Sequence, residues 1–328
     1  MRSIVTPLRI VLGLLLAAMA TATPAQDETT PDAVRVLRAG DSELRVEVVG
    51  VADAGRRAQL QAWLAEVAQA QLTAYGRYPL RSARVRIEQV SREDEGGEDE
   101  SPVPWGQTLR RGDTAVLLYV RGDATIPELR ADWTAIHELS HLFHPYMGRD
   151  GRWLSEGLAS YYQNVLRARA GLLSPEQAWQ LLDAGFERGR RESSGRPLIE
   201  LSRDHKGTMR VYWAGAAFWL EADIALRRDH GRSLDEVLSR YSACCLNGTG
   251  EVAPRAFVEE LDRLAGAQVF APLYARYVDS RAFPSLEAAY RALGIDTRGE
   301  RLVFGDKGPS AVLRHAITSR GSGRAASP

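Results

Sequence analysis

The segment IHELSHLF places two histidines and a glutamate where a helix would present them to one metal ion. His137 and His141 are four residues apart, so on a helix their Cβ atoms lie roughly 5–6 Å apart on one face and both imidazoles can reach a single ion. Glu138 lies next to His137, where its carboxylate can hold water beside that ion. The pattern predicts a hydrolytic zinc site. The alternative is an ordinary amphipathic helix whose two histidines are satisfied by hydrogen bonds.

A catalytic zinc site needs a third protein ligand and an open fourth position. Glu156, in RWLSEGLASYY, opens a second predicted helix after the short turn MGRDGR. Because so short a turn makes the two helices antiparallel, Glu156 returns close to the histidines and completes a His2Glu ligand set. Its alternative role is only to favour the positive N-terminus of its own helix. His144 is a rival ligand, but Pro145 directs it out of the helix, so a role in lining the pocket is expected of it.

Together these motifs resemble the gluzincin metallopeptidases, in which two helix histidines and a downstream glutamate bind zinc. TMRVYWAGAAFWLEADIALRRDHGRSLDEVL is similar to a segment of the glycyl aminopeptidase family, and FAPLYARYVDSRAFPSLEAAYRALGI resembles the segment after that family's catalytic core. The resemblance covers residues 131–295, half of the chain. It implies a zincin-like, thermolysin-type fold, one Zn2+ per chain bound by His137, His141 and Glu156, and Glu138 as general base and later acid.

The resemblance also places Tyr212 where related aminopeptidases have the tyrosine whose hydroxyl stabilises the oxyanion. A tetrahedral intermediate needs such a donor opposite the metal. The alternatives are that Tyr212 is a core aromatic within VYWAGAAFWL, and that His205 is the donor. Gly215 fits a small position that lets this helix approach its neighbour closely.

The chain departs from the family pattern in several places. No GxMEN-like segment precedes the zinc helix, so the glutamate that grips a free substrate amine in the aminopeptidase N group has no counterpart. No PDZ module is seen, and the N-terminal β region is reduced. Ser160 and Gln163 stand where a carboxylate would orient a histidine, so some other carboxylate or a backbone carbonyl is expected to do so.

These features predict an exported zinc metallopeptidase in which Glu138 activates water and Tyr212 holds the oxyanion. The expected partner is a peptide or protein substrate. One alternative is a non-catalytic peptide-binding protein on a peptidase fold, against which the intact Glu138 argues. The other is a zinc hydrolase of a non-peptide substrate, since a fold and its ligands do not define a substrate.

The elements that must position these residues indicate an α+β fold, a small mixed sheet followed by a mainly helical lobe. Alternating apolar residues predict strands within 33–51, 83–90 and 114–121, and helical spacing predicts a helix over 55–75. Further helices are expected at 129–146, 153–170, 174–189, 208–229, 234–243, 253–266 and 284–293. In related enzymes the last strand before the zinc helix pairs with extended substrate, so 114–121 is the predicted edge strand.

The N-terminus is typical of a secretory signal peptide, residues 1–25, with Arg2 and Arg9 before an apolar run and small residues after it. A short membrane anchor is the alternative. The predicted divisions that follow are an α+β subdomain over 26–128, a zinc-binding helical peptidase domain over 129–300, and a partly disordered tail over 301–328 with a short helix near 311–318. Periplasmic or secreted location is expected, with no membrane span after cleavage.

The charge composition of the chain further restricts the classes of binding partner. The chain has 42 basic and 42 acidic residues and a formal net charge of zero, so no long-range field attracts a nucleic-acid backbone. The two cysteines, Cys244 and Cys245, are adjacent, and can form only a strained bond or remain thiols.

Overall fold

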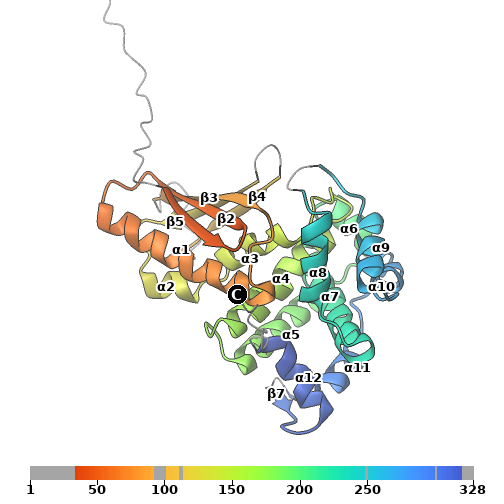
Figure 1. The fold of residues 1–328 in the computed structure, drawn as a ribbon. Coiled ribbons are helices and arrows are strands. Elements are labelled where there is room, and N and C mark those ends of the chain that lie inside the picture. The colour runs from red at the N-terminus through yellow and green to blue at the C-terminus, as the bar shows by residue number, and fades with distance from the viewer. Residues whose placement is uncertain (1–33, 92–100, 111–113, 248–249, 300, 320–328) are drawn as a thin grey trace, which may run out of the picture. The chain divides into compact units, whose positions relative to one another are not determined.

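A five-stranded sheet followed by helices makes up the part of the chain that the structure, a computed structural model, describes: residues 34–91, 101–110, 114–247, 250–299 and 301–319 (Figure 1). These residues all belong to one compact unit, so the predicted division near residue 128 marks a change from sheet to helices. The predicted signal peptide and residues 320–328 of the predicted tail lie outside the described residues.

The sheet is mixed, in the order β1-β2-β3-β5-β4. β1 (Val34–Ala39) and β2 (Ser42–Val49) form the predicted antiparallel hairpin, whose turn uses a left-handed Gly40. β3 (Ser82–Val90) runs parallel to β2, and β5 (Ala115–Arg121) runs parallel to β3. The strands predicted within 33–51, 83–90 and 114–121 are confirmed.

The prediction that 114–121 is the edge strand is wrong. β5 lies between β3 and an additional strand, β4 (Trp105–Leu109), which pairs with it antiparallel and forms the edge among the described strands. In β5, Val116, Leu118 and Val120 on one face are buried, and Leu117 and Tyr119 on the other face are half-buried, as in a strand with a neighbour on each side. β4 escapes sequence analysis because it has five residues, contains Gly106 and buries none of its side chains.

The long helix α1 (Ala54–Tyr75) packs on the sheet, below the strands in Figure 1. Its buried face includes Leu60, Trp63 and Leu64, as the helical spacing predicts. Gln71 of α1 donates a hydrogen bond of 2.6 Å to the carbonyl of Leu139. This bond ties the sheet layer to the helix that carries the histidines.

The predicted helix over 129–146 is divided in two. α2 (Ile126–Ala131) ends where Asp132 adopts extended geometry and accepts a hydrogen bond from the Thr134 amide, and α3 (Thr134–Ser140) then continues into a 3-10 turn, His141–Phe143. A side chain that bonds the backbone in this way stops one helix and starts another.

The other predicted helices are confirmed to within a few residues, and α6 and α10 are additional. Their bounds are α4 Arg152–Arg169, α5 Pro175–Arg191, α6 Leu198–Arg203, α7 Thr208–His230, α8 Leu234–Cys244, α9 Pro254–Ala265, α10 Phe270–Val278 and α11 Glu287–Leu293. In the described part of the chain no helix has both the length and the apolar character needed to cross a membrane.

Residues 301–319 belong to the fold, which corrects their assignment to a tail. β6 (Ile295–Arg298) and β7 (Arg301–Phe304) form a hairpin, and α12 (Pro309–Thr318) packs against α4, as the short helix predicted near 311–318. Buried Arg169 of α4 donates to the carbonyl of Ile317, and buried Arg314 donates to the carbonyl of Leu293. Hydrophobic periodicity cannot predict the burial of an arginine whose hydrogen bonds go to carbonyls distant in the sequence.

The two adjacent cysteines form a disulfide at the end of α8. Of the two states that the sequence left open, the structure contains the bonded one. Neither sulfur is therefore available as a metal ligand in this form.

Candidate metal centre and catalytic cleft

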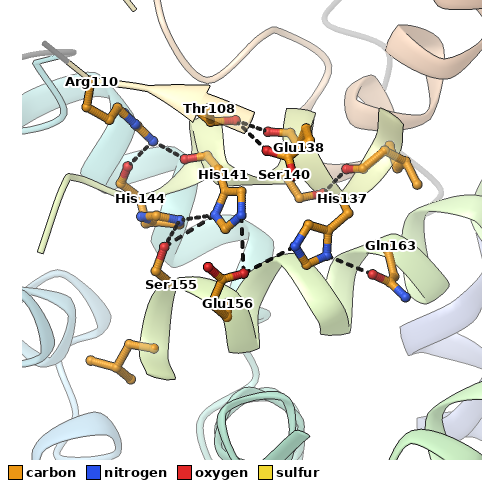
Figure 2. Close-up of polar contacts among 12 residues, drawn as sticks. Thr108, Arg110, His137, Glu138, Ser140, His141, His144, Ser155, Glu156 and Gln163 are labelled. Carbon is orange, nitrogen blue, oxygen red and sulfur yellow. Dashed lines mark hydrogen bonds and ion pairs between the residues drawn. The ribbon is translucent and has the colours of Figure 1, made fainter. Parts of the chain in front are cut away.

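The turn between α3 and α4 brings the three predicted ligands together. His144 is extended, as its place before Pro145 requires, and the chain reverses through a left-handed Gly148 before α4 begins. Figure 2 shows Glu156 of α4 facing the imidazoles of His137 and His141. The antiparallel return predicted from the sequence is thus observed.

The Glu156 carboxylate stands at a zinc-like distance from both histidine nitrogens. Glu156 Oε2 lies 3.3 Å from His137 Nε2 and 3.5 Å from His141 Nε2. Two ligand atoms that are each about 2.1 Å from a tetrahedral ion stand about 3.4 Å apart. Burial acts to raise the pKa of Glu156, but the adjacent imidazoles hold that pKa well below its usual value, so the carboxylate is ionised. A buried, ionised set of two nitrogens and one oxygen fits Zn2+.

Gln163 orients His137. Its Oε1 lies 2.8 Å from His137 Nδ1, and because an amide oxygen only accepts, Nδ1 carries the proton. The lone pair is then on Nε2, which faces Glu156. The expectation that another carboxylate or a backbone carbonyl orients this histidine is wrong: an amide one turn beyond Ser160 does so.

His144 orients His141 in the same way. His144 Nδ1 donates to the carbonyl of Pro145 at 2.7 Å, so its Nε2 is free to accept from His141 Nδ1 at 3.0 Å. Burial, together with the nearby charges of Arg110 and His141, holds the pKa of His144 well below its usual value and keeps it neutral. Ser155 Oγ also bonds His144 Nε2, at 3.0 Å. His144 thus faces away from the ligand atoms and supports a ligand, a role that the sequence did not reveal.

Glu138 is held between α3 and the edge strand. Thr108 of β4 donates from its hydroxyl to the Glu138 backbone carbonyl at 2.8 Å and lies 3.1 Å from the Glu138 carboxylate (Figure 2). A Cβ added to Gly106 would lie 2.5 Å from Glu138 Cγ. The strand therefore fits directly against the glutamate only because residue 106 has no side chain.

Tyr212 of α7 also faces the centre. Its ring stacks on the His137 imidazole, with centroids 5.8 Å apart and planes 7° apart. Burial and the nearby Glu156 charge raise the pKa of Tyr212 above its ordinary value, so the hydroxyl keeps its proton. The alternative donor, His205, is exposed at the rim of the same cleft. Tyr212 is therefore a wall of the cleft and not a fully enclosed core aromatic.

Two glycines set the distance between α4 and α7. A Cβ on Gly215 would lie 1.9 Å from the carbonyl oxygen of Trp153 and 2.7 Å from the Cα of Gly157. Backbone therefore meets backbone at this crossing, as the small residue at 215 predicts. Gly157 follows Glu156 directly on α4, and Gly215 lies about one turn after Tyr212 on α7. The close crossing therefore fixes the positions of these two side chains relative to each other.

The ligand set lies in a cleft of about 440 Å³ between β4, the α3–α4 turn and the start of α7. Its described walls include Trp105 and Thr108 on one side, and Arg152 and Tyr212 on the other. A cleft of this size accommodates a few residues of an extended peptide.

We expect Gln163→Ala to lower zinc affinity by roughly 10- to 100-fold, because His137 loses the acceptor that fixes its tautomer. Gln163→Glu restores an acceptor and should retain most of the affinity. Competition with a zinc chelator measures both variants. Unchanged affinity in the alanine variant would show that this hydrogen bond is not needed.

Comparisons with known proteins agree with this geometry. The sequence model of the M61 glycyl aminopeptidase family matches residues 138–214. Among solved structures, an aminopeptidase N family protein from Idiomarina loihiensis is 15% identical with a TM-score of 0.58, and the match covers 80% of this chain and 49% of that one. An M1 zinc metallopeptidase from Deinococcus radiodurans is 18% identical with a TM-score of 0.45, covering 77% and 52%.

No curated protein matches the chain. The chain spans about half the length of the solved structures that it resembles. The similarity to the Idiomarina protein confirms the predicted metallopeptidase fold, and the family match begins within the zinc motif and ends just beyond Tyr212. The chain therefore has a gluzincin-like fold, and its residues 138–214 resemble the M61 glycyl aminopeptidases.

Proposed function

We propose that the protein is an exported zinc-dependent peptidase that hydrolyses peptide bonds. The observation that carries the proposal is the placement of Glu156 Oε2 within 3.5 Å of both histidine Nε2 atoms, with Glu138 beside them. The match to the M61 family supports it. Export rests on the basic, apolar and small-residue pattern of residues 1–25, and cleavage after Ala22 or Ala25 is checked by the mass of the secreted chain.

His137, His141 and Glu156 would hold one zinc ion. When bound, zinc supplies Lewis acidity, which polarises a substrate carbonyl and lowers the pKa of water. Glu138 accepts a proton from the attacking water and later delivers it to the leaving amine. The Tyr212 hydroxyl donates a hydrogen bond to the oxyanion as it develops.

The edge strand β4 is the proposed binding surface for substrate backbone. It forms one wall of the cleft and pairs only with β5 among the described strands. An extended peptide that adds to such an edge gains affinity from main-chain hydrogen bonds, with little sequence preference. β4 therefore replaces the strand at 114–121 as the proposed strand for pairing with substrate.

Cleavage profiling tests the proposal. The purified mature protein is incubated with a diverse peptide mixture, untreated, after zinc removal by a chelator, and after zinc is added back, and the products are read by mass spectrometry. Cleavage that is lost with zinc and restored with it is expected, and the products distinguish end-trimming from internal cutting. Stoichiometric zinc without cleavage would instead support a binding protein or a hydrolase of another substrate class.

Tyr212→Phe tests the oxyanion donor. We expect kcat to fall by roughly 10²–10³-fold with intact zinc content, because one hydrogen-bond donor to the transition state is lost. Since burial raises the pKa of Tyr212, its hydroxyl stays protonated through the alkaline range. The decrease of kcat at alkaline pH should therefore be the same in the variant and the wild type. If that decrease disappears in the variant, Tyr212 itself titrates there and is not a permanently protonated donor.

A further inference from the structure

Three arginines and two carboxylates line the cleft, an excess of one positive charge. Its described walls contain Arg110, Arg149 and Arg152, whereas their only carboxylates are Glu138 and Glu156, which belong to the zinc centre. None of the three arginines lies within 4 Å of a carboxylate in the described part of the chain. By contrast, Arg203 and Arg196 nearby are paired with Asp150 and Asp204. The cleft is cationic in a chain whose formal net charge is zero.

Arg152 is the best placed of these cations. It is the first residue of α4, one helical turn before Glu156, so both side chains leave the same face of the helix. Its guanidinium lies 5.5 Å from the centroid of the Tyr212 ring. Its Nη1 is buried and has no hydrogen-bond partner. A buried guanidinium N–H without a protein acceptor is unfavourable, so this N–H is available to an acceptor that enters the cleft.

The other two arginines, Arg110 and Arg149, line the same cleft. Arg110 donates through Nη2 to the backbone carbonyls of His141 and His144, and its Nη1 is also buried without a partner (Figure 2). Arg149 is exposed on the turn before α4. These charges strengthen the field that an anionic group meets in the cleft.

The lining residues of the cleft offer a free amine no carboxylate outside the zinc centre, although the Glu251 carboxylate packs against Gly148 at the wall. An ammonium group needs a carboxylate that is not already bound to the metal or engaged in proton transfer, and the described lining residues include none. Positive arginines repel it. A carboxylate, in contrast, matches the planar fork of a guanidinium with two parallel hydrogen bonds.

We infer that Arg152 binds a carboxylate of the peptide substrate beside the zinc centre, so that the cleft selects peptides with a negative charge close to the scissile bond. The inference rests on the proposed peptidase function and names the substrate class of that site. The carboxylate has two possible sources in a peptide, a free C-terminus or an Asp or Glu side chain. Both present the same group to Arg152.

Binding to an inactive enzyme tests the inference without turnover. Zinc-loaded Glu138→Gln protein is titrated by calorimetry with short, N-acetylated alanine peptides that end in a free acid or an amide. A second series, blocked at both ends, carries a single Glu or Gln at successive positions. We expect one series to bind roughly 10- to 100-fold tighter in its charged form than in its neutral form, as a charge-assisted hydrogen bond predicts. The series that does so identifies the source of the carboxylate.

Variants at Arg152 separate recognition from structure. Arg152→Gln, made in the Glu138→Gln background, should bring the ratio of the affinities for the charged and the neutral peptide close to one. Arg152→Lys keeps the positive charge but lacks the two parallel donors of the guanidinium, so it should retain part of the preference for the charged peptide. Arg228→Gln, at an exposed arginine on the far end of α7, is the matched control and should leave the preference intact.

Kinetics with the active enzyme separate this inference from the proposed function. If wild-type protein cleaves charged and neutral peptides with equal KM and kcat, the peptidase assignment stands and carboxylate selection is wrong. The same conclusion follows if Arg152→Gln keeps the full preference. If zinc-loaded protein neither binds nor cleaves any peptide, the proposed function itself fails, and the inference fails with it.

Discussion

Replacing Glu138 with glutamine is expected to abolish peptide cleavage while zinc content and fold remain those of the wild type. Among the described residues that line the cleft, Glu138 has the only carboxylate that is not placed as a metal ligand, and an amide cannot replace it as a proton acceptor. The expected loss of kcat is at least 10²–10⁴-fold, the range that proton transfer by a positioned side chain contributes. Cleavage rate and zinc stoichiometry are measured on the same preparation.

The structure explains why this variant should fold. Glutamine has the shape of glutamate, so it fits beside Gly106, and its amide N–H can donate to the Thr108 hydroxyl oxygen while that hydroxyl still donates to the backbone carbonyl of residue 138. The ligand atoms of the zinc site lie on other side chains. Glu236→Gln, at an exposed position of α8, is the matched control and should retain full activity. A Glu138→Gln protein that cleaves at the wild-type rate would rule out Glu138 as the base.

Gly215→Ala is expected to cost about 3 kcal/mol of unfolding free energy and to remove activity from whatever protein still folds. The new methyl group would lie 1.9 Å from the carbonyl oxygen of Trp153. Because the obstacle is backbone, no side-chain rotation can relieve the overlap, and α7 must move away from α4. That movement separates Tyr212 on α7 from Glu156 on α4. Denaturant unfolding and zinc-dependent cleavage measure the two consequences.

Gly55→Ala is the matched control for this substitution. Gly55 lies in the first turn of α1 and is exposed, and its new Cβ would approach within 4 Å only the Asp53 side chain, the N-cap of α1, at 3.2 Å, a contact that a small shift relieves. Alanine has the higher helix propensity, so the control should unfold at the same or a higher denaturant concentration. Equal stability of Gly215→Ala and wild type would show that the crossing of α4 and α7 tolerates a side chain.

The ligand set could be predicted because local geometry dictates it. Helical periodicity places His137 and His141 on one face, and a short reversing turn brings Glu156 back to them whatever the rest of the chain does. The resemblance places Tyr212 beside the centre, where its ring stacks on His137. It also places the small residue Gly215 where two helices approach closely, as the structure shows. The change from sheet to helices likewise follows from patterns that extend over ten to twenty residues.

The orienting groups depend on tertiary structure. Gln163 and His144 form hydrogen bonds with the two histidines only because α3, the turn and α4 pack at particular distances. Residue type and spacing do not predict these hydrogen bonds.

The position of each strand in the sheet also depends on tertiary structure. Periodicity shows that 114–121 is a buried strand, but its neighbour on each side is a non-local pairing, and the weakly patterned β4 takes the edge. The cationic cleft arises in the same way, since Arg110 and Arg152 come from segments that only folding brings together. Periodicity and spacing determine local elements, whereas strand order, hydrogen-bond partners and the charge of a cleft depend on contacts between distant residues.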